Sequence, residues 1–173
     1  NFQYGYLTSF DSDGFTIQSG SSSIENLNET NKNYVSWNWK CGGAPTATNS
    51  ANIGAAPTSG SVMIDGVASS SAVAGTLLTK KLTANTQSGV STSIYVGNGA
   101  GSGSFAHGLG KKPRFVLHKR INASDSWIAH WQIGTGVLSC ALNDSLAVGT
   151  NDTTYGTHTT DVVTMISSSG ARN

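Results

Sequence analysis

The residues that come closest to a chemical motif lie in "SFAHGLGKKPRFVLHKR", which runs from Ser104 to Arg120. His107 has the residue type of a general base, but no serine or cysteine nearby lies in the strained turn that exposes an activated nucleophile. We therefore expect His107 to hydrogen-bond the backbone at a turn, with Gly108 and Gly110 in conformations closed to other residues. Pro113 completes this turn. The stretch predicts a structural turn, no catalytic residue and no enzyme.

Two neighbouring features have the residue types of phosphate-binding sites. The segment "GNGAGSGS" (97–104) resembles a glycine-rich phosphate loop, but such a loop needs a helix N-terminus after it, and the strand-like "SFAH" follows. Lys111, Lys112 and Arg114 are not interleaved with aromatic residues, so they favour the start of a strand over a nucleic-acid surface. We expect neither phosphate nor nucleic acid as a ligand.

Metal binding is the next chemistry to consider. The four histidines, at positions 107, 118, 130 and 158, lack the short spacings typical of zinc sites. One histidine per subunit around a trimer axis would escape this argument. The segment "DSDG" (11–14) begins like a calcium loop but lacks the remaining carboxylates, and it indicates a turn before a strand. The sequence predicts no metal site and no cofactor.

Aromatic side chains are the last candidates for a binding site. Trp127, His130 and Trp131 lie close together in sequence and form a candidate glycan-binding group, because tryptophan rings stack on sugar rings. Tryptophan is also frequent in protein cores, so we expect at least two of the four tryptophans to be buried. The other two are Trp37 and Trp39.

Composition limits the class of protein. The 173 residues suit one domain, or one domain plus a fragment of another. A net charge of +1 with only 11% charged residues gives no general attraction to nucleic acid or an anionic membrane, and no apolar run is long enough for a membrane helix. Cys41 and Cys140 form a candidate disulfide, but small secreted domains that rely on disulfides usually carry more cysteines, which favours free thiols.

Alternation of apolar and polar residues recurs along the chain, whereas helical periodicity does not. The segments "DGFTIQS" (13–19) and "YVSWNWK" (34–40) both predict strands. Further runs, "VSTSIYV", "FVLHK", "WIAHW" and "GVLSCAL", follow at spacings that suit antiparallel strands and are too short for crossover helices. The sequence predicts an all-β fold, an antiparallel β-sandwich or jelly-roll-like domain with long surface loops and little helix. Phe115 or Leu117 is expected to be buried.

The expected organisation has three parts. Residues 1–40 are the end of a preceding repeat or N-terminal strands, residues 41–60 are a Gly/Ala/Pro/Ser/Thr linker or loop, and residues 61–173 are the main β-sandwich domain. "DGFTIQSGSSSIEN" near the start echoes "DVVTMISSSGARN" at the end, but only the first copy is followed by "YVSWNWK". We therefore expect either that the chain is cut out of phase with its repeat or that the main domain receives its last strand from another region or subunit.

Several of these segments also carry a resemblance. Five segments resemble, in chain order, a repeat domain of virion and tail-fibre-like proteins of tailed phages, marine phages in particular: "DSDGFTI", "NYVSWNWKCGG", "SVMIDG", "YVGNGAGSGSFAHGLGKKPRF" and "SWIAHW". The fourth is the most specific of them. The resemblance implies a non-enzymatic structural module of a virion, in a tail fibre or particle-surface protein, assembled in the bacterial cytoplasm, with host attachment as a candidate role.

The resemblance also implies the partners. These are other copies of the chain, with a trimer favoured for a fibre, and other virion proteins. The alternative function is a lectin-like module that binds host surface glycan.

Overall fold

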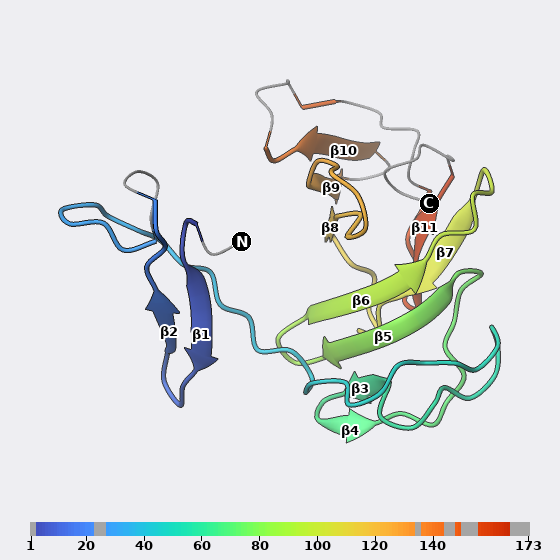
Figure 1. The fold of residues 1–173 in the computed structure, drawn as a ribbon. Helices are drawn as coiled ribbons and strands as arrows, with labels where there is room; N and C mark the ends of the chain where they lie inside the picture. Colours follow the sequence, from blue (N-terminus) through green and yellow to red (C-terminus); the bar gives the residue numbers. More distant parts are fainter. Residues whose placement is uncertain (1–2, 23–26, 134–135, 144–147, 150–155, 167–173) are drawn as a thin grey trace. The chain divides into compact units, whose positions relative to one another are not determined.

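The computed structural model describes residues 3–22, 27–133, 136–143, 148–149 and 156–166. These residues form eleven β-strands and no helix, which confirms the all-β fold expected from the sequence (Figure 1). The described part of the chain therefore has no helix that could cross a membrane. Contacts divide the chain into two compact units, Asn1–Asn38 and Trp39–Asn173, and each has its own sheets.

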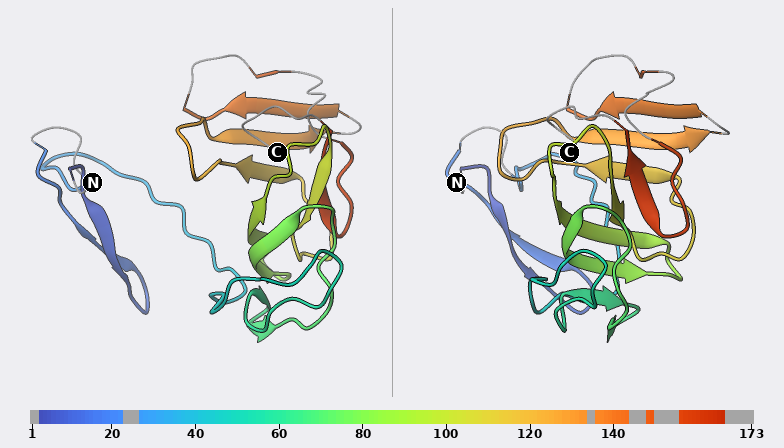
Figure 2. Two further views of the ribbon diagram at one scale, coloured as in Figure 1. Left: turned by 45° about the vertical axis from the view of Figure 1, so that its right-hand side comes forward. Right: turned by 90° about the vertical axis from the view of Figure 1, so that its right-hand side faces the viewer.

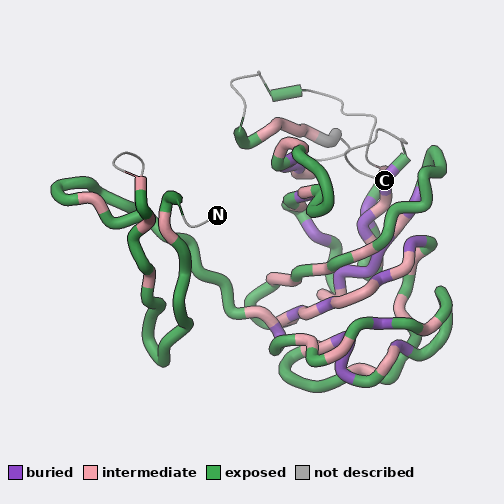
Figure 3. Tube along the Cα trace, viewed as in Figure 1, coloured by how far each residue is buried: buried purple, intermediate pink, exposed green. Residues whose placement is uncertain are grey.

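The first unit contains one β-hairpin. Strand β1 (Tyr6–Phe10) pairs antiparallel with β2 (Phe15–Gln18), and the expected turn lies between them, where the Asp11 N–H donates to Gly14 O at 2.9 Å. The Asp11 carboxylate accepts hydrogen bonds from the hydroxyls of Ser9 and Thr16, which fixes it within the hairpin. Most hairpin residues are exposed, and a two-stranded hairpin alone is only marginally stable in water (Figure 3).

The second unit begins with a mixed four-stranded sheet in the order β4-β3-β5-β6. The strands are β3 (Val62–Ile64), β4 (Val67–Ala68), β5 (Leu78–Asn85) and β6 (Val90–Val96). Strand β3 runs parallel to β5, whereas the other two pairs are antiparallel. Strand β5 buries Thr79, Leu82 and Ala84, with a register shift between Thr79 and Lys81 that places Thr79 three residues before Leu82, so this strand forms the floor of the core.

Two further sheets complete the second unit. Strand β7 (Gly103–Ala106) pairs antiparallel with β11 (Val162–Met165). Strand β9 (Ile128–Ile133) is the centre of an antiparallel sheet between β8 (Phe115–His118) and β10 (Gly136–Ala141). The two views of Figure 2 show the β8–β10 sheet at one end of the unit and the β3–β6 sheet at the other, with β7 and β11 between them.

The core lies where these sheets meet. One cluster joins four buried residues from β7, β11 and the position just before β5: Leu77, Phe105, Val163 and Met165. Tyr95 and Val116 pack against this cluster. A second cluster joins β3, β5 and β7: Val62, Leu82, Ala84 and Ala106. Because side chains of facing sheets form both clusters, the unit is sandwich-like, as the sequence predicts.

Residues 41–60, expected as a linker or loop, form a loop held on β5. Asn49 is buried, and its amide donates to Thr79 O at 3.0 Å while its carbonyl oxygen accepts the N–H groups of Ala51 and Thr58. One side chain therefore satisfies three backbone groups, which gives the loop a defined position.

Candidate interaction surface

All four histidines of the chain are buried in the second unit. The His118 ring on β8 meets the Phe105 ring edge-on at a centroid distance of 5.3 Å and lies parallel to the His130 ring at 5.2 Å. His130 in turn meets the edge of His158 at 5.2 Å. His118, His130 and His158 thus form a continuous row of rings, which we call the histidine row. It lies between strands β7, β8 and β9 and the segment before β11.

Two of the histidines are held in a neutral form by the backbone. His107 Nδ1 accepts the Leu109 N–H at 3.1 Å, and its Nε2–H donates to Thr159 O at 3.3 Å. His158 Nδ1 accepts the Thr164 N–H at 3.2 Å. Burial lowers the pKa of His107, and it lowers the pKa of His158 to about 4 with further contributions from Lys112 and His107.

These positions show what the histidines do. His107 closes the turn expected from the sequence, in which Gly108 and Gly110 have φ angles of 67° and 62°. Within the described ranges, no three residues among His, Cys, Asp and Glu are arranged to hold a metal ion. The three rings therefore pack between the sheets, and the backbone N–H groups that donate to His107 and His158 require these two imidazoles to be neutral.

Pairing within the β8–β10 sheet sorts its side chains onto two faces. Val116 lies opposite His130 and His118 lies opposite Ile128, and these four residues share the inner face that covers Phe105. Phe115 lies opposite Trp131, so these two residues belong to the other face. We call it the outer face.

The outer face is mainly apolar. Its rows follow from the register: Phe115, Trp131 and Leu138, then Leu117, Ala129 and Cys140, then Lys119, Trp127 and Leu142, the last row lying just beyond the ends of the three strands. The Leu142 N–H donates to Trp127 O at 2.8 Å, which continues the β9–β10 pairing into the last row. Phe115 and Leu142 are each 57% exposed.

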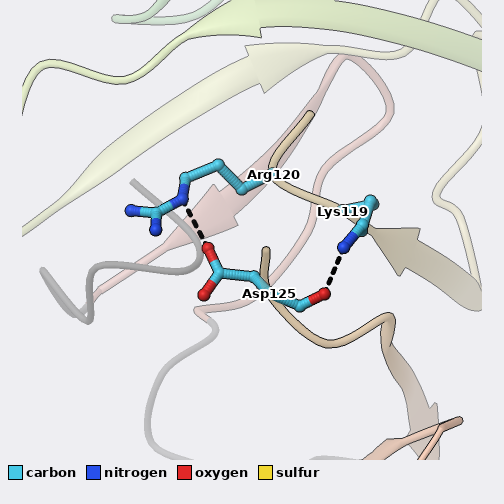
Figure 4. Close-up of polar contacts among 3 residues, drawn as sticks. All are labelled: Lys119, Arg120 and Asp125. Carbon is cyan, nitrogen blue, oxygen red and sulfur yellow. Dashed lines mark hydrogen bonds and ion pairs between the residues drawn. The ribbon is translucent and has the colours of Figure 1, made fainter. Parts of the chain in front are cut away.

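The loop from β8 to β9 is fixed by charge (Figure 4). The Arg120 guanidinium pairs with the Asp125 carboxylate, and Lys119 Nζ donates to the backbone oxygen of Asp125. These contacts hold the loop closed at the end of the outer face. Within β8, β9 and β10 the outer face contains no charged side chain, and Lys119 continues it beyond the end of β8.

A second exposed apolar surface is the segment Tyr34–Lys40, which we call the aromatic segment. The sequence prediction of a strand here is wrong, because the segment has no strand assignment. Trp37 and Trp39 are 76% and 65% exposed, and Val35 is 77% exposed. Alternation alone does not make a strand, since a strand also needs a neighbouring backbone to hydrogen-bond with.

The structure separates the predicted glycan-binding group. Trp127 and Trp131 lie together on the outer face, but His130 is on the inner face and fully buried. The expectation of at least two buried tryptophans is wrong: Trp37, Trp39 and Trp127 are exposed and Trp131 is half-buried. Cys41 and Cys140 are free, as the sequence favoured.

Sequence reasoning missed half of the outer face. Phe115 and Leu117 are both exposed, so the expectation that one of them is buried is wrong. Leu138 and Leu142 were recognised only as members of a separate strand. Combining the three alternating runs into one outer face requires the pairing register of β8, β9 and β10. That register is set only when the strands pair.

Comparison with known proteins places the chain in a family. No curated protein and no solved structure matches it. One family model, described as a domain of unknown function (DUF7483), matches residues 1–81 and residues 62–173. The two matches overlap at residues 62–81 and together cover the whole sequence, so the chain belongs to the DUF7483 family.

Proposed function

We propose that the chain is a non-enzymatic structural module whose apolar surfaces are covered by other proteins in an assembly. The observation that carries this proposal is the outer face, on which four large apolar side chains remain exposed: Phe115, Leu117, Trp127 and Leu142. Exposed apolar surface of this extent is typical of protein interaction sites. The aromatic segment adds a second surface of the same kind.

The sequence resemblance gives the assembly its proposed identity. The segments that resemble repeat domains of tailed-phage virion proteins support a place in a tail fibre or on a particle surface, with other copies of the chain and other virion proteins as partners. A trimer is the favoured state for a fibre. Host attachment is the proposed role of such a surface component.

The positions of the histidines support a role without catalysis. A general base needs a lone pair directed at a substrate, whereas the Nδ1 atoms of His107 and His158 accept backbone N–H groups. Both side chains are buried, and their pKa values are lowered by that burial.

A lectin-like module is the second candidate function. It is favoured by Phe115, Trp127 and Trp131, three aromatic side chains on one face. Sugar sites combine such rings with hydrogen-bonding groups that fix the orientation of the ligand. Apart from Lys119, whose Nζ donates to Asp125 O, the other residues in these rows are leucine, alanine and cysteine, so the outer face is better suited to a protein partner than to a glycan.

The experiment that tests the proposed function is localisation. Antibodies against the purified chain should label particles released from a host that produces it, and a cryo-electron micrograph should show the labelled part. Recovery of the chain only in the particle-free fraction would contradict the virion role. Binding of the purified chain to a glycan array, abolished by Trp131→Ala and retained by Ile121→Ala, would favour the lectin.

A further inference from the structure

We infer that the β1–β2 hairpin is a donor element, which completes the β-sandwich of another unit of this family that has no hairpin of its own at the corresponding place. There the hairpin would take the position that residues 156–166 take in the second unit of this chain. This inference rests on the proposed assembly function, and it names both the surface that docks and the kind of unit that accepts it.

The two hairpins of the chain have the same loop. In the first, the Asp11 N–H donates to Gly14 O at 2.9 Å, and in the second, the Thr159 N–H donates to Val162 O at 3.0 Å. Each loop therefore has two residues between the bonded pair, and a loop of defined length fixes the register of the strands beside it. Gly14 thus corresponds to Val162, and β2 corresponds to β11.

The strands beyond the loops keep this correspondence. The Thr8 hydroxyl donates to Thr16 O at 3.0 Å, and the Gly156 N–H donates to Thr164 O at 3.1 Å. In both hairpins the accepting oxygen is therefore two residues beyond the one in the loop. The segments that correspond, one residue for one, are 8–18 and 156–166.

The sequence agrees with the correspondence. Asp13 and Thr16 have identical counterparts in Asp161 and Thr164. The two matches to the family model also contain one hairpin each. A repeated element needs neighbouring elements to bury its apolar face, so the packing of the second hairpin indicates what the first one requires.

In the second unit, this element faces the core. Val163 and Met165 of β11 are buried and belong to the cluster that contains Phe105. His158, on the other arm of the hairpin, is also buried and packs against the His130 ring. Three side chains of this hairpin are thus covered by the rest of the unit.

The corresponding side chains of the first hairpin are apolar and remain accessible to solvent. Phe10 is 81% exposed and Phe15 is exposed, whereas Ile17 is half-buried (Figure 3). Phe10 lies opposite Phe15 in the register, and Ile17 is two residues further along β2, so all three share one face. The corresponding positions are Phe10 for His158, Phe15 for Val163 and Ile17 for Met165.

The edge of β2 is the second part of the donor surface. Gly14 O and Thr16 O accept hydrogen bonds from residues of β1 and its loop, so the backbone groups of Phe15 and Ile17 point to the other edge. In β11, the corresponding edge pairs with β7. Among the described residues, β1 is the one strand paired with β2. The β2 edge can therefore pair with a strand of a partner.

The acceptor must present an open edge of the β7 type. In this chain that edge is paired with β11, and Val163 and Met165 fill the cluster beside it. A hairpin that is joined to its own unit acts at a high effective concentration, which a hairpin from a second copy does not match. The partner is therefore a unit of the same family without a hairpin at β7.

The first test is a graft in the full 173-residue chain. Residues 157–166 receive the sequence of residues 9–18, and Gly156 is kept because a Cβ there would lie 2.9 Å from Thr164 Cγ2. We expect cooperative urea unfolding with a midpoint lowered by about a third, because a phenylalanine must fit at the place of Val163. The matched control is the same graft with serine at the two core positions, which should abolish cooperative unfolding.

The second test measures docking between chains. The acceptor is the full chain with Val163→Asp and Met165→Asp, because two carboxylates cannot remain in an apolar cluster. It also carries Phe10→Ser and Phe15→Ser, so that it has no donor face. The donor is the parent chain, whose own site is filled. Sedimentation velocity of the mixture should show an equimolar complex that neither protein forms alone.

Donor variants separate the hairpin from other surfaces. Phe10→Ser with Phe15→Ser should weaken docking by about 100-fold, because it removes two of the three apolar side chains of the face. Val67→Ser with Ile121→Ser changes two exposed apolar residues outside the hairpin, and this control should dock like the parent.

Docking decides the question where the acceptor folds, and the graft decides it where the acceptor does not. An acceptor that folds and does not bind the parent would overturn the inference, as would docking that survives Phe10→Ser with Phe15→Ser. In the graft, unfolding that is no more cooperative than that of the serine control would do the same. Self-association of the parent that is lost with Phe10→Ser and Phe15→Ser would overturn the open-edge requirement and identify an intact second copy as the partner.

None of these results bears on particle labelling. Labelled particles without docking would refute the donor role alone, and docking without labelled particles would refute the virion role alone.

Discussion

Acidification is expected to weaken the fold through His158. This side chain is buried, and its Nδ1 accepts the Thr164 N–H at 3.2 Å. An imidazolium carries a proton on both ring nitrogens. Protonated His158 therefore cannot accept the Thr164 N–H, which is left without its hydrogen-bond partner. Lys112 adds positive charge nearby, as does His107 once it is protonated, and both charges favour the neutral ring of His158.

The magnitude follows from the pKa. Lowering the pKa of His158 from 6.5 to about 4 corresponds to about 3 kcal/mol in favour of the neutral form. The folded pKa is below the unfolded one, so the unfolded chain takes up the proton first as the pH falls. The contribution is complete above about pH 6.5, declines below it, and is lost once the pH reaches about 4. At about pH 4.5 the expected loss is about 2 kcal/mol.

The assay is urea unfolding, followed by tryptophan fluorescence at fixed protein concentration from neutral pH to about pH 4.5. The control is His158→Asn, because the asparagine oxygen can accept the Thr164 N–H and does not titrate. Carboxylates titrate equally in both proteins, so the difference between the two curves isolates His158. The parent should lose about 2 kcal/mol more than the variant. Parallel curves would refute the reasoning.

The remaining predictions concern the backbone of the second unit. Gly108→Ala should cost about 2–3 kcal/mol of unfolding free energy, because its φ is +67° and a Cβ would lie 2.8 Å from Leu82 Cδ2. Gly110 has a similar φ but open space around it, so Gly110→Ala should cost only about 1–2 kcal/mol. Equal urea midpoints for the two variants would contradict the packing argument. Asn49→Ala should cost about 2–4 kcal/mol, since three backbone groups lose their partner, and it should raise amide exchange at Ala51 and Thr58. Unchanged exchange there would show that the loop is held by other contacts.

The strands were predictable where side-chain alternation and pairing coincide. In β5 and β6, polar and apolar residues alternate and each strand has a neighbour, so pattern and structure agree. The aromatic segment shows the same alternation without a paired strand. Alternation reports which side chains would share a face, and it contains no information on whether a backbone is available to pair with.

It was harder to predict which face of each strand packs against the core. Phe115 or Leu117 was expected to enter the core, but Val116 and His118 do so instead. Period-two patterning places alternate residues on opposite faces and leaves open which face is covered. The histidines gave no local signal of burial either, because their partners are Thr159 and Thr164, which are brought close only by the fold.

The composition of the β8–β10 sheet connects these observations. Strands covered on one face usually alternate cleanly, whereas strands covered on both faces read as nearly continuous apolar runs. "FVLH" and "WIAHW" are of the second kind, with apolar side chains on the inner and outer faces alike. The inner face, which includes His118 and His130, is covered by Phe105 and His158. A protein partner on the outer face would give both faces the environment that these sequences require.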